Sequence, residues 1–162
     1  MKYNTSEISN ILHNGDTFTK ISILSSLSET TDLAIIREII SALDDKEIRV
    51  RGEAFSSLFL NFNDVSEVLI SSLTSESKNI RGFCALILAN RGNTNSINSL
   101  INLTKDTSGM VRSCAFGALG HLKAKKAKNE IHTGIFDENN EVKKSAAFAL
   151  YLIEEKLSDL EK

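Results

Sequence analysis

The sequence predicts an all-α fold, a right-handed α-solenoid (an α–α superhelix) built from about five helix pairs. Three observations predict it: a repeat of about 31 residues, apolar positions spaced as on one face of a helix, and the absence of an alternating strand pattern. One helix pair cannot bury its apolar stripe alone, so successive pairs stack into one continuous core. The 162 residues include no proline, so no proline break is expected within a helix.

The repeat is marked by a basic residue that recurs every 30 or 31 positions. Seven residues after it every copy has leucine, and three residues after it every copy has a small or apolar residue. The basic column is Lys20, Arg51, Arg81, Arg112 and Lys143, and the leucine column is Leu27, Leu58, Leu88, Leu119 and Leu150. Offsets −1, +3, +4 and +7 from the basic residue share one face of an α-helix, which predicts a helix B with a core stripe in every copy.

Each copy also has an upstream helix A, separated from its neighbours by turn and capping signals such as NFND and RGNT. The expected A helices span 6–13, 33–43, 65–73, 95–103 and 125–133. We expect a single domain over 1–162 with repeats at about 5–28, 32–60, 64–90, 94–122 and 125–155. The last B helix is expected to continue through YLIEEKLSDLEK.

Composition argues against several classes of protein. The formal net charge is −2, from 19 basic and 21 acidic residues, whereas a dedicated nucleic-acid binder usually has a basic excess. Two cysteines are too few for a disulfide framework or a cysteine-rich zinc site. No apolar run approaches a membrane span, and MKYNTSEISN has no apolar signal core. We therefore expect a soluble, cytoplasmic protein with no cofactor and no metal.

The pattern VRxxAxxAL on helix B resembles the HEAT-like repeats of the phycobilisome-lyase (PBS lyase) type, best in VRSCAFGAL and VKKSAAFAL. The resemblance implies an armadillo-like helical solenoid and leaves the function open. In that family the basic residue usually pairs with an acidic residue four positions earlier. Only Asp16 and Glu47 stand at that position here, which argues against a continuous charged ladder along the stack.

The arginines of the basic column are interpreted as structural residues. Arg51, Arg81 and Arg112 are expected to pack their stems and to hydrogen-bond the turns between helices A and B.

Enzymatic branches of the family leave few signs in this chain. The deoxyhypusine hydroxylases carry several His-Glu dipeptides that bind two irons, but here no histidine precedes glutamate. The alkylpurine DNA glycosylases use a basic face with tryptophans, and this chain has neither. A third branch, the phycobilin lyases, supplies the alternative hypothesis: an enzyme or enzyme subunit acting on a tetrapyrrole or modifying a protein.

Helix B has a second face, turned away from the core, and in right-handed solenoids of this kind it lines the concave surface. Large apolar side chains at offsets +2, +5 and +9 indicate a site for a partner's helix or extended peptide. The candidate partner-binding residues are Glu53, Leu60, Phe83, Leu86, Cys114, Gly117, His121, Phe148 and Leu152. Gly117 is expected to let the partner approach closely. Burial within a tight superhelix and homodimerisation are the competing explanations, and the oligomeric state is left open.

LKAKKAK at 122–128 is the one basic cluster of the sequence, with Lys123, Lys125, Lys126 and Lys128. It is suited to steering an acidic partner or RNA. No aromatic residue interleaves the lysines, so base stacking is unsupported, and a solvated turn is the competing interpretation.

No phosphate loop, nucleophile motif or zinc-spaced set appears in the sequence. Cys84 is expected to be a small buried hydrophobe and Cys114 to be more exposed. The sequence therefore predicts a non-catalytic protein-protein interaction scaffold that binds a partner peptide or helix on the concave B-helix face. Neither a nucleic acid nor a membrane is expected as a partner, and RNA binding through the lysine cluster is a third hypothesis.

Overall fold

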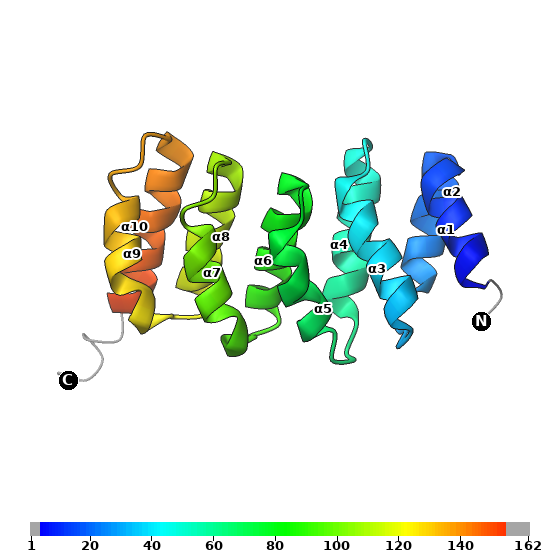
Figure 1. Cartoon of the computed structure of the whole chain (residues 1–162), viewed down its shortest axis with the longest axis horizontal. Helices are drawn as coiled ribbons and strands as arrows, with labels where there is room; N and C mark the ends of the chain where they lie inside the picture. The colour runs from blue at the N-terminus through cyan, green and yellow to red at the C-terminus, as the bar shows by residue number, and fades with distance from the viewer. Residues whose placement is uncertain (1–3, 155–162) are drawn as a thin grey trace. The chain divides into compact units, whose positions relative to one another are not determined.

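The computed structural model describes residues 4–154 (Figure 1). Every regular element in this range is an α-helix or a short 3₁₀ turn, and none is a strand. The fold is therefore the all-α solenoid of helix pairs that the repeat predicts. The chain divides into two compact units, one ending at Ser72 and the other beginning at Leu73.

The first unit contains two helix pairs and one further A helix. Its elements are α1 (Thr5–Asn14), α2 (Thr17–Ser26), α3 (Leu33–Ser41), the 3₁₀ turn η1 (Ala42–Asp44), α4 (Ile48–Leu60) and α5 (Ser66–Ser71). The B helices α2 and α4 pack against each other, and α3 packs against α1, α4 and α5. Side chains of Asn4, Asp16 and Asp32 accept backbone N–H groups and so fix where the first three helices begin.

The second unit begins within the 3₁₀ turn η2 (Ser72–Thr74). Its elements are α6 (Lys78–Asn90), η3 (Thr94–Ser96), α7 (Ile97–Leu103), α8 (Gly109–His121), η4 (Lys125–Ala127), α9 (Lys128–Gly134) and α10 (Asn140–Glu154). The B helix α8 packs against α6 and α10, as seen at the yellow-green and orange helices of Figure 1. α7 packs against α8, and α9 packs against α10.

The expected helices are found, with differences at their ends. The A helix expected over 33–43 closes in the 3₁₀ turn η1, and the one expected over 125–133 opens with the 3₁₀ turn η4. Such turns are common where a helix begins or ends. The expected continuation of the last B helix beyond Glu154 lies outside the described residues.

The core is built from the repeated columns. Leu27, Leu58, Leu88 and Leu119 of the leucine column are at most 2% exposed. Leu150, on the last described helix, is half-buried. The residue before the basic column is also buried in three copies, as Val50, Val111 and Val142. The stripe at 3.6-residue spacing is therefore the buried face of each B helix.

The arginines of the basic column hold the turns that precede their own helices, as predicted. Nη1 of Arg51 donates to the Asp45 carbonyl at 2.7 Å, and Nη1 of Arg81 donates to the Ser75 carbonyl at 2.7 Å. Nη1 of Arg112 donates in the same way to the Asp106 carbonyl at 2.9 Å. Each carbonyl lies six residues before its arginine, so the contact closes the turn between helices A and B.

The same column also forms ion pairs, and here the expectation from the family pattern is wrong. The partner is an aspartate 25 residues later, in the turn of the next repeat, rather than an acid four residues earlier. The pairs are Lys20–Asp45 at 2.7 Å, Arg81–Asp106 at 2.8 Å and Arg112–Asp137 at 2.8 Å. The second unit therefore holds two such pairs and the first unit holds one. Among the described residues Arg51 forms no ion pair, so the charged ladder is not continuous, as the sequence indicated.

The third copy carries serine in place of this aspartate. Ser75 keeps the local role, because its hydroxyl accepts the Ser77 N–H at 3.2 Å, as the Asp106 carboxylate accepts the Ser108 N–H at 2.8 Å. Asp16, which the family pattern placed in an ion pair, instead caps α2 through the Thr19 N–H. Within residues 4–154 no helix has the length and apolar character needed to cross a membrane.

Candidate partner-binding face

The B helices α6, α8 and α10 lie next to one another in the second unit and present one continuous face. An α-helix turns by about 100° per residue. The residue at offset +5 therefore points away from the middle of the core stripe. In these three helices the +5 residues are Leu86, Gly117 and Phe148. We call the surface around this row the B-helix face of the second unit.

The B helices pack closely against one another on both sides of α8, and we call these two packing contacts the seams. A Cβ added at Gly82 would lie 3.0 Å from the Met110 sulfur and 3.3 Å from the Cys114 sulfur, so α6 and α8 approach closely there. A Cβ added at Gly120 would lie 2.7 Å from the Ala149 Cα, which marks the seam between α8 and α10. Gly82, at offset +1, lets α8 approach α6, and Gly120, at offset +8, lets α10 approach α8.

These seams account for two predicted site residues that are less open than expected. Cys114 and Leu152 stand at offsets +2 and +9, and both are half-buried. The Cys114 sulfur faces Gly82, and a Leu152 methyl group lies 3.4 Å from the Cβ position of Gly120. Both side chains therefore contribute to packing between helices.

Gly117 is the open point of the row. A Cβ added there would meet no heavy atom within 4 Å, although the residue lies between two packed helices. The position is therefore open space over the α8 backbone, which we call the notch. Leu86 of α6 and Phe148 of α10 hold the same offset in their helices. That Gly117 admits the close approach of a partner stays a prediction.

Phe148 is the most exposed apolar side chain of the row, at 59%. Its ring stacks on Tyr151, one helical turn further along α10, with ring centroids 6.4 Å apart. Tyr151 is itself 57% exposed and was not among the predicted site residues. Its spacing of three residues from Phe148 is the signal that places the two rings on one side of a helix.

The other predicted residues differ in exposure. Phe83 and Leu86 on α6 are half-buried, so the expectation that they are openly exposed is only partly met, whereas His121 at the end of α8 is exposed. In the first unit Glu53 is half-buried, and Leu60 is 64% exposed at the end of α4.

Sequence reasoning missed the apolar side chains around Leu60. Phe59 is 43% exposed and Phe62 is 77% exposed, and both lie next to Leu60 in the chain. The sequence shows them only as a short apolar run at a helix end. Such a run does not indicate which side chains are buried and which are exposed.

The cysteines offer no reactive thiol. Cys84 is fully buried, as predicted. Burial raises the pKa of the Cys114 thiol from 9.0 to about 11, so the thiol is protonated at neutral pH. Within residues 4–154 no group of three or more histidine, cysteine or acidic side chains is arranged to hold a metal ion.

The lysine cluster lies in the turn between α8 and α9, at the edge of the second unit. Lys123, Lys125, Lys126 and Lys128 are all exposed. Nζ of Lys126 donates to the Asn98 side-chain oxygen at 2.7 Å, and Nζ of Lys128 pairs with Glu154 at 2.9 Å. The cluster is separate from the row at Gly117.

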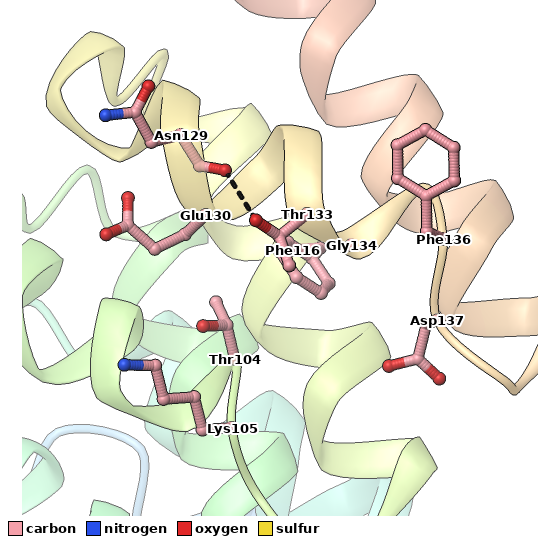
Figure 2. Close-up of a pocket in the computed structure, with 9 residues that line it drawn as sticks. All are labelled: Thr104, Lys105, Phe116, Asn129, Glu130, Thr133, Gly134, Phe136 and Asp137. Carbon is pink, nitrogen blue, oxygen red and sulfur yellow. Dashed lines mark hydrogen bonds between the residues drawn. The ribbon is translucent and has the colours of Figure 1, made fainter.

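A cleft of about 400 Å³ on the A-helix side was not anticipated (Figure 2). Thr104 and Lys105 lie on one side of it, with Glu130 and Thr133 of α9 on the other. The buried Phe116 ring forms part of its lining and fits there because position 134 is glycine: an added Cβ would lie within 3 Å of the ring. Phe116 stands at offset +4, on the core side of helix B. The sequence pattern therefore predicted a core residue there and did not indicate a cleft.

The helix pairs, their 31-residue register and the arginine contacts define a protein of the α-solenoid class. The profile of the family described as HEAT repeats matches residues 66–151. The chain therefore belongs to the HEAT-repeat family. A comparison with curated protein sequences finds no significant match.

Solved structures of similar fold agree with this assignment and with the resemblance to phycobilisome-lyase-type repeats. The complex of CpcE and CpcF of phycocyanin lyase from Nostoc sp. PCC7120 is 18% identical, with a TM-score of 0.65 over 98% of this chain and 68% of that chain. An engineered protein is 19% identical, with a TM-score of 0.56 over 93% and 80%. A designed armadillo repeat protein in complex with the peptide (KR)4 is 17% identical, with a TM-score of 0.52 over 92% and 81%.

Proposed function

We propose that this chain is a non-catalytic interaction module that binds a helix or extended peptide of a partner protein on the B-helix face of the second unit. The observation that carries the proposal is the open space at Gly117, in the same row as the apolar side chains of Leu86 and Phe148. An apolar partner side chain entering the notch would lie against the α8 backbone. Fully burying one large apolar side chain contributes about 1.5–3 kcal/mol.

The geometry suits a helix-in-groove or extended-peptide mode of recognition. Phe148 and Tyr151 provide a stacked aromatic anchor that is more than half exposed. Aromatic residues of this kind are frequent energetic centres of interfaces. His121 adds a polar, exposed group at the end of α8, where a rim contact would orient the partner.

The similar structures support this class of function, because two of them are described with a protein or peptide partner. CpcE and CpcF form a complex with each other, and the designed armadillo repeat protein holds the peptide (KR)4. Neither similarity identifies the partner of this chain. A cytoplasmic location and the absence of a nucleic-acid partner stay predictions.

A displayed library of random peptides, selected for binding to the wild-type chain, tests the proposal. The selected peptides are then measured against Gly117→Leu, which fills the notch. Gly52→Leu is the matched control, because a Cβ at Gly52 on the B helix α4 also meets nothing within 4 Å. We expect Gly117→Leu to weaken binding by at least about tenfold, which corresponds to losing one apolar anchor, and Gly52→Leu to change it little.

Equal binding by the two variants would contradict the assignment of the face. Circular dichroism confirms that each variant folds. Analytical ultracentrifugation of the wild type and of Phe148→Asp tests the homodimer alternative: a dimer lost in the variant would make the face a self-association surface instead.

The alternative hypothesis, an enzyme or enzyme subunit of the phycobilin-lyase type, has a separate test. Visible absorbance after incubation of the purified protein with a bilin would show a bound tetrapyrrole as a shifted band. The likeness to the phycocyanin lyase structure, at 18% identity, concerns the fold alone and does not favour this function over peptide binding.

A further inference from the structure

The turn that carries the lysine cluster departs from the equivalent turn one repeat earlier. Residues 122–128, which we call the lysine turn, correspond to residues 91–97 with an offset of 31. Four neutral residues of the earlier turn, Gly92, Thr94, Asn95 and Ile97, are replaced by Lys123, Lys125, Lys126 and Lys128, while Arg91 is replaced by Leu122. The change concentrates positive charge without altering the helix pairs that the turn connects.

Two of the departures are unfavourable for the turn itself. Lys123 has φ +49°, in the left-handed region, where the earlier turn has Gly92 at φ +68°. A residue with a Cβ is strained there, and glycine is not. Ala124 replaces Asn93, whose side chain caps the following 3₁₀ turn by accepting the Ser96 N–H at 2.9 Å, and Ala124 provides no such cap. The sequence of the lysine turn is therefore not the one that stabilises it best.

The charge of the lysine turn is only partly balanced by the fold. Among residues 4–154 Lys128 pairs with Glu154, and Lys126 contacts only the neutral Asn98 side chain. Lys123 and Lys125 form no ion pair within that range. Positions 121–130 hold four lysines and a single acid, Glu130. Among the residues that the structure describes, three ammonium groups of the turn therefore have no carboxylate partner.

We infer that the lysine turn is a docking surface for an acidic segment, rich in aspartate or glutamate, of a protein partner. The observed strain at Lys123 and the missing cap at Ala124 are the features that motivate a functional role for this turn. Carboxylates that approach this edge are attracted by three ammonium groups that have no carboxylate of their own among the described residues. The inference goes beyond the proposed function and holds whichever side chains anchor a partner on the B-helix face.

Other charges of the unit favour a short acidic segment over a nucleic acid. The turn between α9 and α10 carries Asp137 and Glu138, and Glu141 follows in α10. A long polyanion crossing the unit would meet these carboxylates, whereas a segment confined to one edge would not. No phenylalanine, tyrosine or tryptophan stands within 121–130 to stack a base, and the one ring there that could do so is His121.

The test uses the full chain and a fluorescein-labelled hexaglutamate peptide, followed by fluorescence anisotropy at low salt. The first variant is Lys123→Gln/Lys125→Gln/Lys126→Gln. The control, Lys78→Gln/Lys105→Gln/Lys144→Gln, changes the net charge equally, and its three lysines are exposed residues outside the lysine turn. We expect the first variant to bind at least about tenfold more weakly and the control to change by less than about twofold.

Lys123→Gly separates a role in binding from a role in the fold. The substitution is expected to raise the midpoint of thermal unfolding, because it relieves the left-handed strain, and also to weaken hexaglutamate binding. A merely structural lysine would give no loss of binding.

Three results would overturn the inference. They are no measurable binding of hexaglutamate by the wild type, equal weakening by both triple variants, and tighter binding of a labelled RNA hexamer than of hexaglutamate. The last result would assign the lysine turn to RNA.

Discussion

Arg112 and Asp137 form a two-pronged ion pair between successive repeats. Nε of Arg112 donates to one Asp137 carboxylate oxygen at 2.8 Å, and Nη2 donates to the other at 2.9 Å. The third guanidinium nitrogen, Nη1, holds the Asp106 carbonyl of the turn before the arginine. One side chain therefore fixes two turns at once. Arg81 repeats the arrangement with the Asp106 carboxylate at 2.8 and 2.9 Å.

Replacing Asp106 by asparagine should lower the free energy of unfolding by about 2–4 kcal/mol, because it breaks a largely buried ion pair and leaves the Arg81 charge uncompensated. Urea unfolding at neutral pH measures the loss. Glu138→Gln is the control, since the Glu138 side chain is 91% exposed and lies 3.8 Å from Arg112; it should cost less than about 0.5 kcal/mol. Equal losses would show that the pair adds nothing to stability.

The ladder also makes stability depend on acid. Burial opposes ionisation of Asp106, but hydrogen bonds from Arg81 and from the Ser108 N–H outweigh it and hold its pKa below the ordinary 3.8. Hydrogen bonds from Arg112 likewise hold the pKa of Asp137 below 3.8. A carboxyl with a lowered pKa in the folded state stabilises the fold above its ordinary pKa, and this contribution is lost as the pH falls through the lowered value.

We therefore expect the urea midpoint to be steady near neutral pH and to fall below about pH 5. The double variant Asp106→Asn/Asp137→Asn should show a shallower fall, because two of the responsible groups no longer titrate. Parallel curves for wild type and double variant would assign the acid sensitivity to other groups.

Two glycines of α8, three residues apart, should respond oppositely to alanine. Gly117→Ala places a Cβ in open space and should stabilise the chain by about 0.5–1 kcal/mol through the helix preference of alanine. Gly120→Ala places a Cβ 2.7 Å from the Ala149 backbone, and overpacking of this kind costs about 1–3 kcal/mol. Thermal unfolding of both variants checks the sign, and a destabilising Gly117→Ala would mean that the notch is filled.

Cys114 should react slowly with iodoacetamide. A thiol pKa raised from 9.0 to about 11 lowers the thiolate fraction about 100-fold at pH 8. A thiolate of higher pKa is a stronger nucleophile, and this offsets part of the loss in rate. The net rate should be at least about tenfold below that of a free cysteine. The variant Cys84→Ala isolates the Cys114 signal, and mass spectrometry follows the adduct. Alkylation as fast as in the unfolded chain would show that the thiol is not held in the seam.

The repeat register could be predicted because it depends on local spacing. The basic column, the leucine column and the positions of the A helices all follow from offsets within one helix. The interruption of the ion-pair ladder was indicated correctly, and it falls at Arg51. The acidic partners themselves were missed, because they are aspartates of the following repeat. Spacing inside one motif does not reveal which neighbouring turn approaches an arginine.

Exposure on the B-helix face was harder to predict for a related reason. Helical periodicity placed Cys114, Leu152 and Gly117 on the same side of their helices. How closely two helices approach depends on Gly82 and Gly120, whose effect appears only once the neighbouring helix is in place. The cleft beside Gly134 has the same origin, because the Phe116 ring reaches it from another helix.

Every described ion pair joins residues no more than 26 positions apart. During synthesis, each basic residue of the ladder can therefore form its ion pair as soon as the turn of the next repeat has left the ribosome. We call such an ion pair a clamp. Contacts of such short sequence separation form rapidly, and folding can advance from the amino end as synthesis proceeds. A copied block of 31 residues would bring its own arginine and aspartate with it, so the array can lengthen by duplication without redesign of the clamps.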